Sequence, residues 1–183
     1  MDYTLIRSDR KTVGFEINEN GLIVRAPRRM PKAQIDRLIE KDRERIEKHI
    51  GKFADRRKNL EGVSRLAPNE ITALAQKARG YIPERVKYYA EKLGVEYGNI
   101  TIRAQKTRWG SCSAKRNLNF NCALMLAPVE VIDSVVVHEL CHMIEPNHSK
   151  AFYDCIYKVF PDYDNCRKWL KENGDRLIKQ ISG

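Results

Sequence analysis

Hydrophobic and polar positions alternate with a period of two near the N-terminus, which predicts short antiparallel strands over residues 3–26. In TVGFEIN (residues 12–18) every second side chain is apolar, so one face of this strand is apolar. Asn20-Gly21 follows, a pair favoured in two-residue hairpin turns, and the apolar run LIVRA resumes after it. The segment therefore predicts a β-hairpin.

The hydrophobic period then changes to that of a helix. Over 32–57 the apolar residues recur at spacings near three, four and seven, which predicts one long amphipathic helix with a stripe of Ile35, Leu38, Ile39, Ile46, Ile50 and Phe53. Helical spacing begins again at Ile71. Gly80 and Pro83 interrupt this second pattern, so a separate helix is expected over 83–93.

The C-terminal half combines both periods. Strands are expected over 99–105 and 117–124, separated by the loop TRWGSCSAKRN. A strongly apolar helix is expected to begin at Pro128, followed by helices over about 149–159 and 163–180. The two expected strands could be neighbours in a small sheet.

Composition excludes several classes of protein. No segment approaches the roughly 20 consecutive apolar residues that span a bilayer, and the N-terminus lacks a secretory pattern. The five cysteines are an odd number without CxxC spacing, which argues against a disulfide framework. We therefore expect reduced thiols, a cytoplasmic location and no membrane association.

The net charge of +10 is unevenly distributed along the chain. Residues 27–65 hold thirteen basic and seven acidic residues, net +6, and residues 77–116 hold ten and three, net +7. Such segments form either solvated helix surfaces or a surface that faces a polyanion such as nucleic acid or a nucleotide. The sequence leaves both interpretations open.

The segment VVVHELCH contains the chemistry. His138 and His142 are four residues apart and share one face of a helix, where two imidazoles can bind one metal ion. Glu139 lies one position further round and could take a proton from a water at the metal. Histidines on such an apolar helix are costly to bury without a partner, which favours a metal site over two isolated side chains.

Catalytic zinc sites usually have three protein ligands and leave the fourth position to water. His148 is the preferred third ligand, because Pro146 ends the helix and lets the chain turn back towards the pair. Three of the four histidines in the chain then lie within eleven residues. Glu145 is the rival ligand, three residues after His142.

Further candidates surround this segment. In KTRWGSC (106–112), Arg108 could orient a carboxylate or phosphate of a substrate, with Trp109 beside it. The alternative is that Trp109 anchors the core. Tyr153 follows the predicted third ligand and could contact the substrate, although a core aromatic is the more common role of such a residue. Cys112 and Cys141 are expected to be packing residues.

Taken together, these sequence segments resemble the YgjP-like metallopeptidases, which are related to the Wss1-like and SprT-like zincins. The resemblance lies in KTRWGSCS (106–113) and in NLNFNCALMLAPVEVIDSVVVHELCHMIEPNHSKAF (117–152), and it extends through IPERVKYYAEKLGV (82–95). It implies a zincin-like α+β fold, Zn²⁺ at His138, His142 and His148, and Glu139 as general base. It also makes Arg108 and Trp109 part of the active-site surroundings.

The residue patterns and the family resemblance together predict a single domain over 1–183. Residues 1–65 are expected to form the hairpin and the long helix, and residues 66–183 the catalytic core. The expected function is zinc-dependent hydrolysis of peptide bonds in a peptide or protein substrate. Two alternatives remain. One is a metal-dependent nucleotide or phosphoanhydride hydrolase, against which the chain has no Gly-rich phosphate cradle and no carboxylate cluster for magnesium. The other is a nucleic-acid-associated protease.

Overall fold

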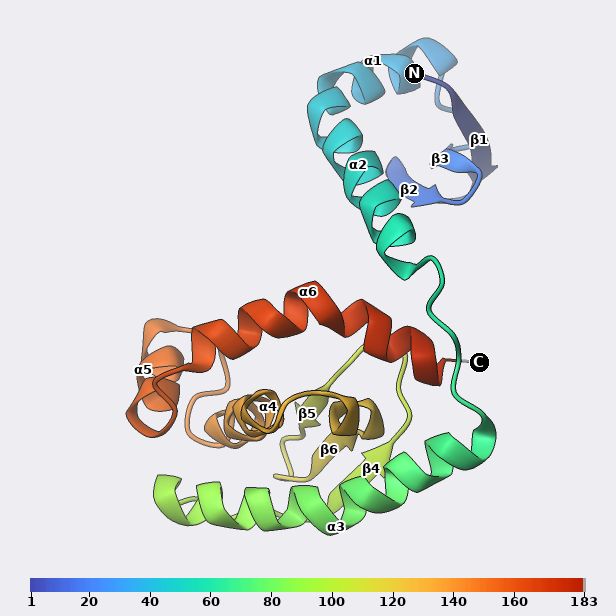
Figure 1. Ribbon diagram of the computed structural model, residues 1–183. Coiled ribbons are helices and arrows are strands. Elements are labelled where there is room, and N and C mark those ends of the chain that lie inside the picture. Colours follow the sequence, from blue (N-terminus) through green and yellow to red (C-terminus); the bar gives the residue numbers. More distant parts are fainter. Residues whose placement is uncertain (183) are drawn as a thin grey trace. The chain divides into compact units, whose positions relative to one another are not determined.

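A computed structural model of the protein describes residues 1–182 (Figure 1). The chain folds into two compact units, Met1–Glu61 and Gly62–Gly183. Each unit has a hydrophobic core of its own. The expected organisation as a single domain stays a prediction, and the two units are described separately.

The N-terminal unit contains a three-stranded sheet of order β1-β3-β2, with β1 (Tyr3–Ser8), β2 (Gly14–Asn18) and β3 (Gly21–Pro27). The predicted hairpin is confirmed as the antiparallel pair β2–β3, and Gly21 has the positive φ of 100°. The expectation that all strands are antiparallel is wrong for β1, which pairs in parallel with β3. The chain reverses its direction once between β1 and β2 and again between β2 and β3, so β1 and β3 run the same way.

Two helices pack against this sheet: α1 (Lys32–Lys41) and α2 (Arg43–Leu60). The single helix expected over 32–57 is wrong, because the helix breaks at Asp42 (φ −97°, ψ 10°). The break changes the direction of the chain, as the ribbon shows (Figure 1). It allows both helices to bury their apolar stripes in one core with the inner face of β3, formed by Ile35, Ile39, Ile46, Leu22, Val24 and Ala26.

The C-terminal unit contains a second small sheet, of order β4-β6-β5. It consists of β4 (Ile100–Arg103), β5 (Gly110–Cys112) and β6 (Leu118–Asn121), with β4 parallel and β5 antiparallel to β6. A 3₁₀ helix, η1 (Cys122–Leu126), follows β6. Strand β5 lies in the segment that the sequence analysis treated as a loop, because three residues are too few to produce a period of two.

The described part of this unit also contains four helices, of which the first two contact the sheet: α3 (Pro68–Leu93), α4 (Val129–Cys141), α5 (Lys150–Val159) and α6 (Tyr163–Ile181). Helix α4 contacts the other three helices and β5, and it lies between α3 and α6 (Figure 1). Nearly every residue of α4 is buried, which explains its continuous apolar sequence. The α+β class and the placement of HExxH on a helix are confirmed. No helix within residues 1–182 has the length and apolar character needed to cross a membrane.

Helix α3 continues through Gly80 and Pro83, so the interruption expected there is wrong. One face of α3 is buried from Ala78 to Ala90, and its buried residues follow the helical period on both sides of the proline: Ala78, Ile82, Val86, Tyr89 and Ala90. Burial of this continuous stripe outweighs the hydrogen bond that proline removes from the helix. Gly94 ends the helix in the left-handed conformation, with φ 66°.

A buried ion pair joins α3 to α4. Arg85 donates two hydrogen bonds to the carboxylate of Asp133, at 2.7 and 2.6 Å, and the hydroxyl of Tyr89 donates a third at 3.1 Å. The Asp133 side chain is 7% exposed. Because α4 holds HExxH, this pair orients the helix that positions the site.

Replacing Asp133 with alanine is expected to lower the free energy of unfolding by about 3 kcal/mol, since it leaves the partly buried Arg85 without a partner. Glu130→Ala removes an exposed carboxylate from the same helix and is the matched control. Urea denaturation of the two variants and the wild type measures the difference. Equal midpoints for both variants would show that the pair does not stabilise the packing of α3 on α4.

Candidate metal centre

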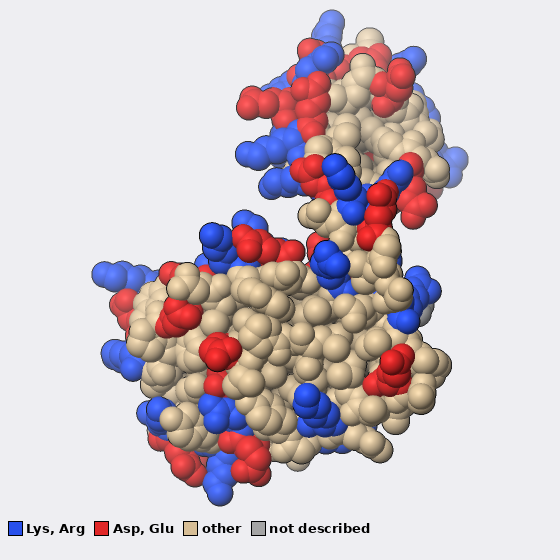
Figure 2. All heavy atoms as spheres, in the orientation of Figure 1, with Lys and Arg blue, Asp and Glu red and all other residues tan. Residues whose placement is uncertain are grey.

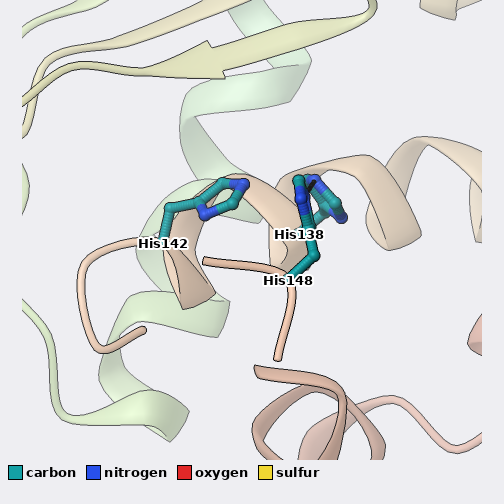
Figure 3. A group of neighbouring side chains, drawn as sticks. All are labelled: His138, His142 and His148. Carbon is teal, nitrogen blue, oxygen red and sulfur yellow. Dashed lines mark hydrogen bonds between the residues drawn. The ribbon is translucent and has the colours of Figure 1, made fainter. Parts of the chain in front are cut away.

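Three histidines converge at the C-terminal end of α4. His138 lies on the last turns of the helix, His142 is its C-terminal cap, and His148 lies in the loop before α5. Figure 3 shows the rings of all three facing a common point, two from the helix and one from the loop. The chain reversal predicted between His142 and His148 therefore brings His148 to the pair, but the helix end predicted at Pro146 is wrong, because α4 ends at Cys141.

The nitrogen atoms of this cluster have a spacing that suits one metal ion. The donor atoms of His138, His142 and His148 all lie within 4.8 Å of one another, and the two Nε2 atoms of His138 and His148 are 3.2 Å apart. Nitrogens about 2.1 Å from one tetrahedral ion lie roughly 3.4 Å apart, so small ring rotations bring all three to ligand distance. The three histidines thus have the spacing needed to hold one metal ion.

Two further groups orient the imidazoles. The hydroxyl of Tyr163, on α6, lies 2.7 Å from Nδ1 of His138, and the backbone carbonyl of Glu145 lies 3.4 Å from Nδ1 of His142. Both contacts leave Nε2 for the metal, in the manner of outer partners that fix the tautomer of metal-binding histidines. Glu145 thus contributes a backbone oxygen, and its carboxylate is not part of the donor cluster.

Tyr163 was missed by the sequence analysis. It begins the last helix, fifteen positions beyond the expected third ligand, and only 6% of it is exposed. In sequence it resembles any core aromatic of an amphipathic helix. Its role depends on the packing of α6 against α4, which no local pattern indicates.

Burial keeps His138 and His142 in the form that binds metal. It lowers the pKa of His138 to about 4, with smaller contributions from the charges of His142, His148 and Arg167. Burial also lowers the pKa of His142. Both imidazoles are therefore neutral at pH 7, and a neutral imidazole is the species that donates its lone pair to a metal.

Glu139 lies beside the cluster and is 6% exposed. Burial raises the pKa of its carboxyl to about 7, although a hydrogen bond from the backbone of Cys112 and the charge of Arg108 act to lower it. A carboxylate with a pKa near the working pH can both accept and return a proton. Glu139 can thus exchange a proton near neutral pH with a group bound in its surroundings.

A cleft of about 740 Å³ opens onto the histidines and Glu139. Strand β5 forms one wall and is the edge of its sheet, with no further strand of residues 1–182 paired to it. Trp109 and Ser113, which flank β5, each form a backbone hydrogen bond of 2.9 Å with a residue at an end of β6 or next to it. In an antiparallel ladder only every second residue bonds to the neighbouring strand. The backbone groups of Gly110 and Cys112 therefore point away from β6, and the backbone of Cys112 forms a hydrogen bond with the carboxylate of Glu139. The cleft is therefore lined by a strand edge that pairs with no further strand of residues 1–182 and is bonded to Glu139 through Cys112.

Comparison with known proteins agrees with this geometry. Residues 65–173, more than half of the chain, match the family described as YgjP-like, metallopeptidase domain. This chain belongs to the YgjP-like metallopeptidase domain family. The resemblance found in the sequence is thereby confirmed, and the YgjP-like region includes α4, the loop with His148 and most of α6.

Individual relatives of this YgjP-like chain are more distant. A UTP pyrophosphatase of Escherichia coli (strain K12) is 31% identical over 71 residues, which are 37% of this chain and 42% of the relative, so the chain spans less than half of that protein. Two solved structures are also similar over 50% of this chain. The metallopeptidase zymogen jannalysin of Methanocaldococcus jannaschii has 23% identity, 94% of its chain covered and a TM-score of 0.46. The metallopeptidase zymogen abylysin of Pyrococcus abyssi has 20% identity, 93% of its chain covered and a TM-score of 0.45.

Three further residues of the YgjP-like chain were predicted to contact the substrate, and they differ in their surroundings. Arg108 lines the cleft. Trp109 packs against the core on α6, where a β-carbon at Gly174 would lie 2.8 Å from its ring. The ring of Tyr153 has its centroid 6.5 Å from that of His148. Substrate contact by these three residues stays a prediction.

The two cysteines considered in the sequence lie close to the centre. Cys112 lines the cleft, while Cys141 is buried with its sulfur 3.4 Å from that of Cys155. Burial raises the pKa of both Cys112 and Cys141. Neither thiol belongs to the donor cluster of the described residues.

Asn121 holds the segment that carries Arg108. Its side chain is fully buried, donates to the carbonyls of Gln105 and Arg108 at 2.7 and 2.9 Å, and accepts from the N–H of Ala123 at 3.1 Å. A buried amide with these partners fixes the backbone around it. The sequence analysis missed this residue, because an asparagine at the end of a strand usually marks a turn.

Gly110→Ala is expected to lower kcat/KM at least tenfold without loss of metal. A β-carbon at Gly110 would lie 2.7 Å from both Cγ and Oε1 of Glu139, so the carboxylate has to move away from its place beside β5. Gly80→Ala, where nothing lies within 4 Å of the added carbon, is the matched control. Steady-state kinetics and metal content measure the effect, and unchanged kinetics in Gly110→Ala would contradict the close approach.

Proposed function

We propose that this protein is a zinc-dependent metallopeptidase that hydrolyses peptide bonds, with Glu139 as general base. The observation that carries the proposal is the position of Glu139, which is buried, lines the same cleft as the three histidines and is bonded to the outer edge of β5 at Cys112. Membership of a metallopeptidase domain family supports it.

Zinc is the metal that suits the donor set best. Three imidazole nitrogens from His138, His142 and His148, with one position left open, are a common arrangement in catalytic zinc sites. Bound zinc would polarise the scissile carbonyl and lower the pKa of the attacking water. Glu139 would take the proton of that water and return it to the leaving amine, while Tyr163 holds His138 in its tautomer.

Strand β5 supports a peptide as the substrate. Its outward backbone groups, at Gly110 and Cys112, lie along the cleft beside Glu139. An extended peptide can add to such an edge as a further strand, which aligns its backbone with the catalytic residues. This mode of binding orients a peptide bond through its main chain and needs no particular side chain.

A second candidate is hydrolysis of nucleoside triphosphates, as the name of the Escherichia coli relative indicates for that protein. Arg108 and Arg116 line the cleft and could bind phosphates. On the face drawn in Figure 2, however, basic and acidic side chains are interspersed. Nucleic-acid or nucleotide binding by the basic segments 27–65 and 77–116 stays a prediction.

The test offers the zinc-loaded protein an unfolded polypeptide and a panel of nucleoside triphosphates in parallel. We expect peptide fragments and intact triphosphates, with cleavage stopped by a chelator and restored by zinc. Cleavage of triphosphates together with an intact polypeptide would overturn the peptidase proposal and leave the metal centre standing.

We also propose a cytoplasmic location, which the thiol state supports. All five cysteines are free, including the Cys141–Cys155 pair with its sulfurs 3.4 Å apart. Such thiols persist in a reducing compartment. Alkylation of freshly isolated, unreduced protein is expected to label five thiols after denaturation; fewer labelled thiols would contradict the proposal.

A further inference from the structure

A second cavity, of about 300 Å³, lies next to the cleft between α4, α6 and the segment 107–110. The two cavities share Arg108, Gly110, His138 and Glu139 in their walls. A bond that reacts at Glu139 therefore lies where the two cavities meet. A side chain next to that bond can enter the second cavity while the peptide backbone follows the cleft.

The second cavity has an apolar body. Trp109, Val135 and Leu170 line it, and Trp109 is held in place by its contact with Gly174 on α6. The volume corresponds to roughly ten waters, at the lower limit of small-molecule pockets. It suits one side chain with aliphatic carbons and is small for a nucleotide.

Two guanidinium groups line this apolar body, those of Arg108 and Arg167. Neither forms an ion pair within residues 1–182; Arg167 instead lies over the ring of Tyr153, with its Cζ 5.8 Å from the ring centroid. The other residues that line the cavity include no carboxylate apart from Glu139.

We propose that the second cavity is a specificity subsite for a carboxylate of the peptide substrate, next to the bond that is cleaved, with Arg108 and Arg167 as its cationic groups. The inference rests on the proposed peptidase function. Guanidinium groups pair with planar carboxylates through two parallel hydrogen bonds. The apolar walls meanwhile contact the methylene groups that carry the carboxylate, as in a glutamate side chain. The carboxylate belongs either to an acidic side chain or to the C-terminus of the peptide.

The test compares matched peptides on the zinc-loaded protein. One pair has blocked ends and differs only by glutamate or glutamine next to the cleaved bond; the other is neutral and ends in a free carboxylate or an amide. We expect the charged member of one pair to have at least a tenfold higher kcat/KM, and the pair that responds identifies the source of the carboxylate.

Substitutions on α6 test whether the preference for the charged peptide depends on the second cavity. Arg167→Gln is expected to reduce the ratio between charged and neutral peptides several-fold, and Arg167→Glu to invert it in favour of a lysine peptide. Lys168→Gln removes the neighbouring exposed charge, which lines neither cavity, and is expected to keep the ratio. Calorimetric binding of the same peptides to Glu139→Gln protein gives the ratio without turnover.

The outcomes separate this inference from the proposed function. Equal cleavage of charged and neutral peptides would overturn the subsite and leave the peptidase intact. A preference that Arg167→Gln and Lys168→Gln reduce equally would also overturn it, because general attraction to a basic protein then explains the preference. If no peptide is cleaved and triphosphates are, the peptidase proposal fails and the subsite falls with it.

Discussion

Replacing Glu139 with glutamine is expected to lower kcat of peptide cleavage by about 10²- to 10⁴-fold, the usual contribution of a positioned general base. Glutamine preserves the shape of the side chain beside β5 but cannot accept the proton of the attacking water. KM is expected to change little, because the outward edge of β5 and the second cavity remain. Steady-state kinetics on a peptide substrate measure both quantities.

The pH profile provides a control for this substitution. The wild-type kcat/KM should fall with falling pH as Glu139 becomes protonated, because a protonated carboxyl accepts no proton. Burial raises the pKa of this group to about 7, and the charge of a bound zinc ion acts to lower it, so the fall occurs at or below about pH 7. Glu139→Gln should lack this acid limb. An acid limb that persists unchanged in the variant would assign the titration to another group.

Replacing any one of the three histidines with alanine is expected to abolish metal-dependent cleavage, down to the rate of chelated wild-type protein. Each substitution removes one of three imidazole nitrogens and leaves two, too few to hold a catalytic zinc ion firmly. Zinc titration followed by calorimetry should show a loss of affinity larger than the 10- to 100-fold that removal of an outer partner causes.

The fourth histidine offers a matched control for this series. His49 lies exposed on α2, in the N-terminal unit and outside the cluster. His49→Ala should bind zinc and cleave peptide like the wild type. Full activity in His148→Ala, with loss of activity in His138→Ala and His142→Ala, would show that the third ligand is a different group.

The metal cluster was predictable because its information is local. Two histidines four residues apart share a helical face whatever surrounds them, and the histidine that follows six residues later lies close along the chain. The position of the helix end was predicted less well, because α4 ends at Cys141 and not at the residue before Pro146. The β2–β3 hairpin was predictable for the same reason. The burial of Glu139 could only be inferred from the apolar run that precedes it.

The parts that were missed depend on contacts between distant segments. Tyr163 reaches His138 only because α6 packs against α4, and Asn121 holds the backbone of Arg108 from the end of β6. The break at Asp42 and the continuity of α3 through Pro83 follow from which arrangement buries the apolar stripe, and tertiary burial outweighs local preference in both. The second cavity is likewise formed by three segments that no short motif connects.

Native mass spectrometry of the purified protein tests the central claim most directly, because it counts the metal ions on each folded chain. We predict one zinc ion on the wild type and on Glu139→Gln, and none on His138→Ala. A wild-type chain without metal after growth and purification in zinc, or an ion that survives replacement of His138, His142 and His148 together, would contradict the account.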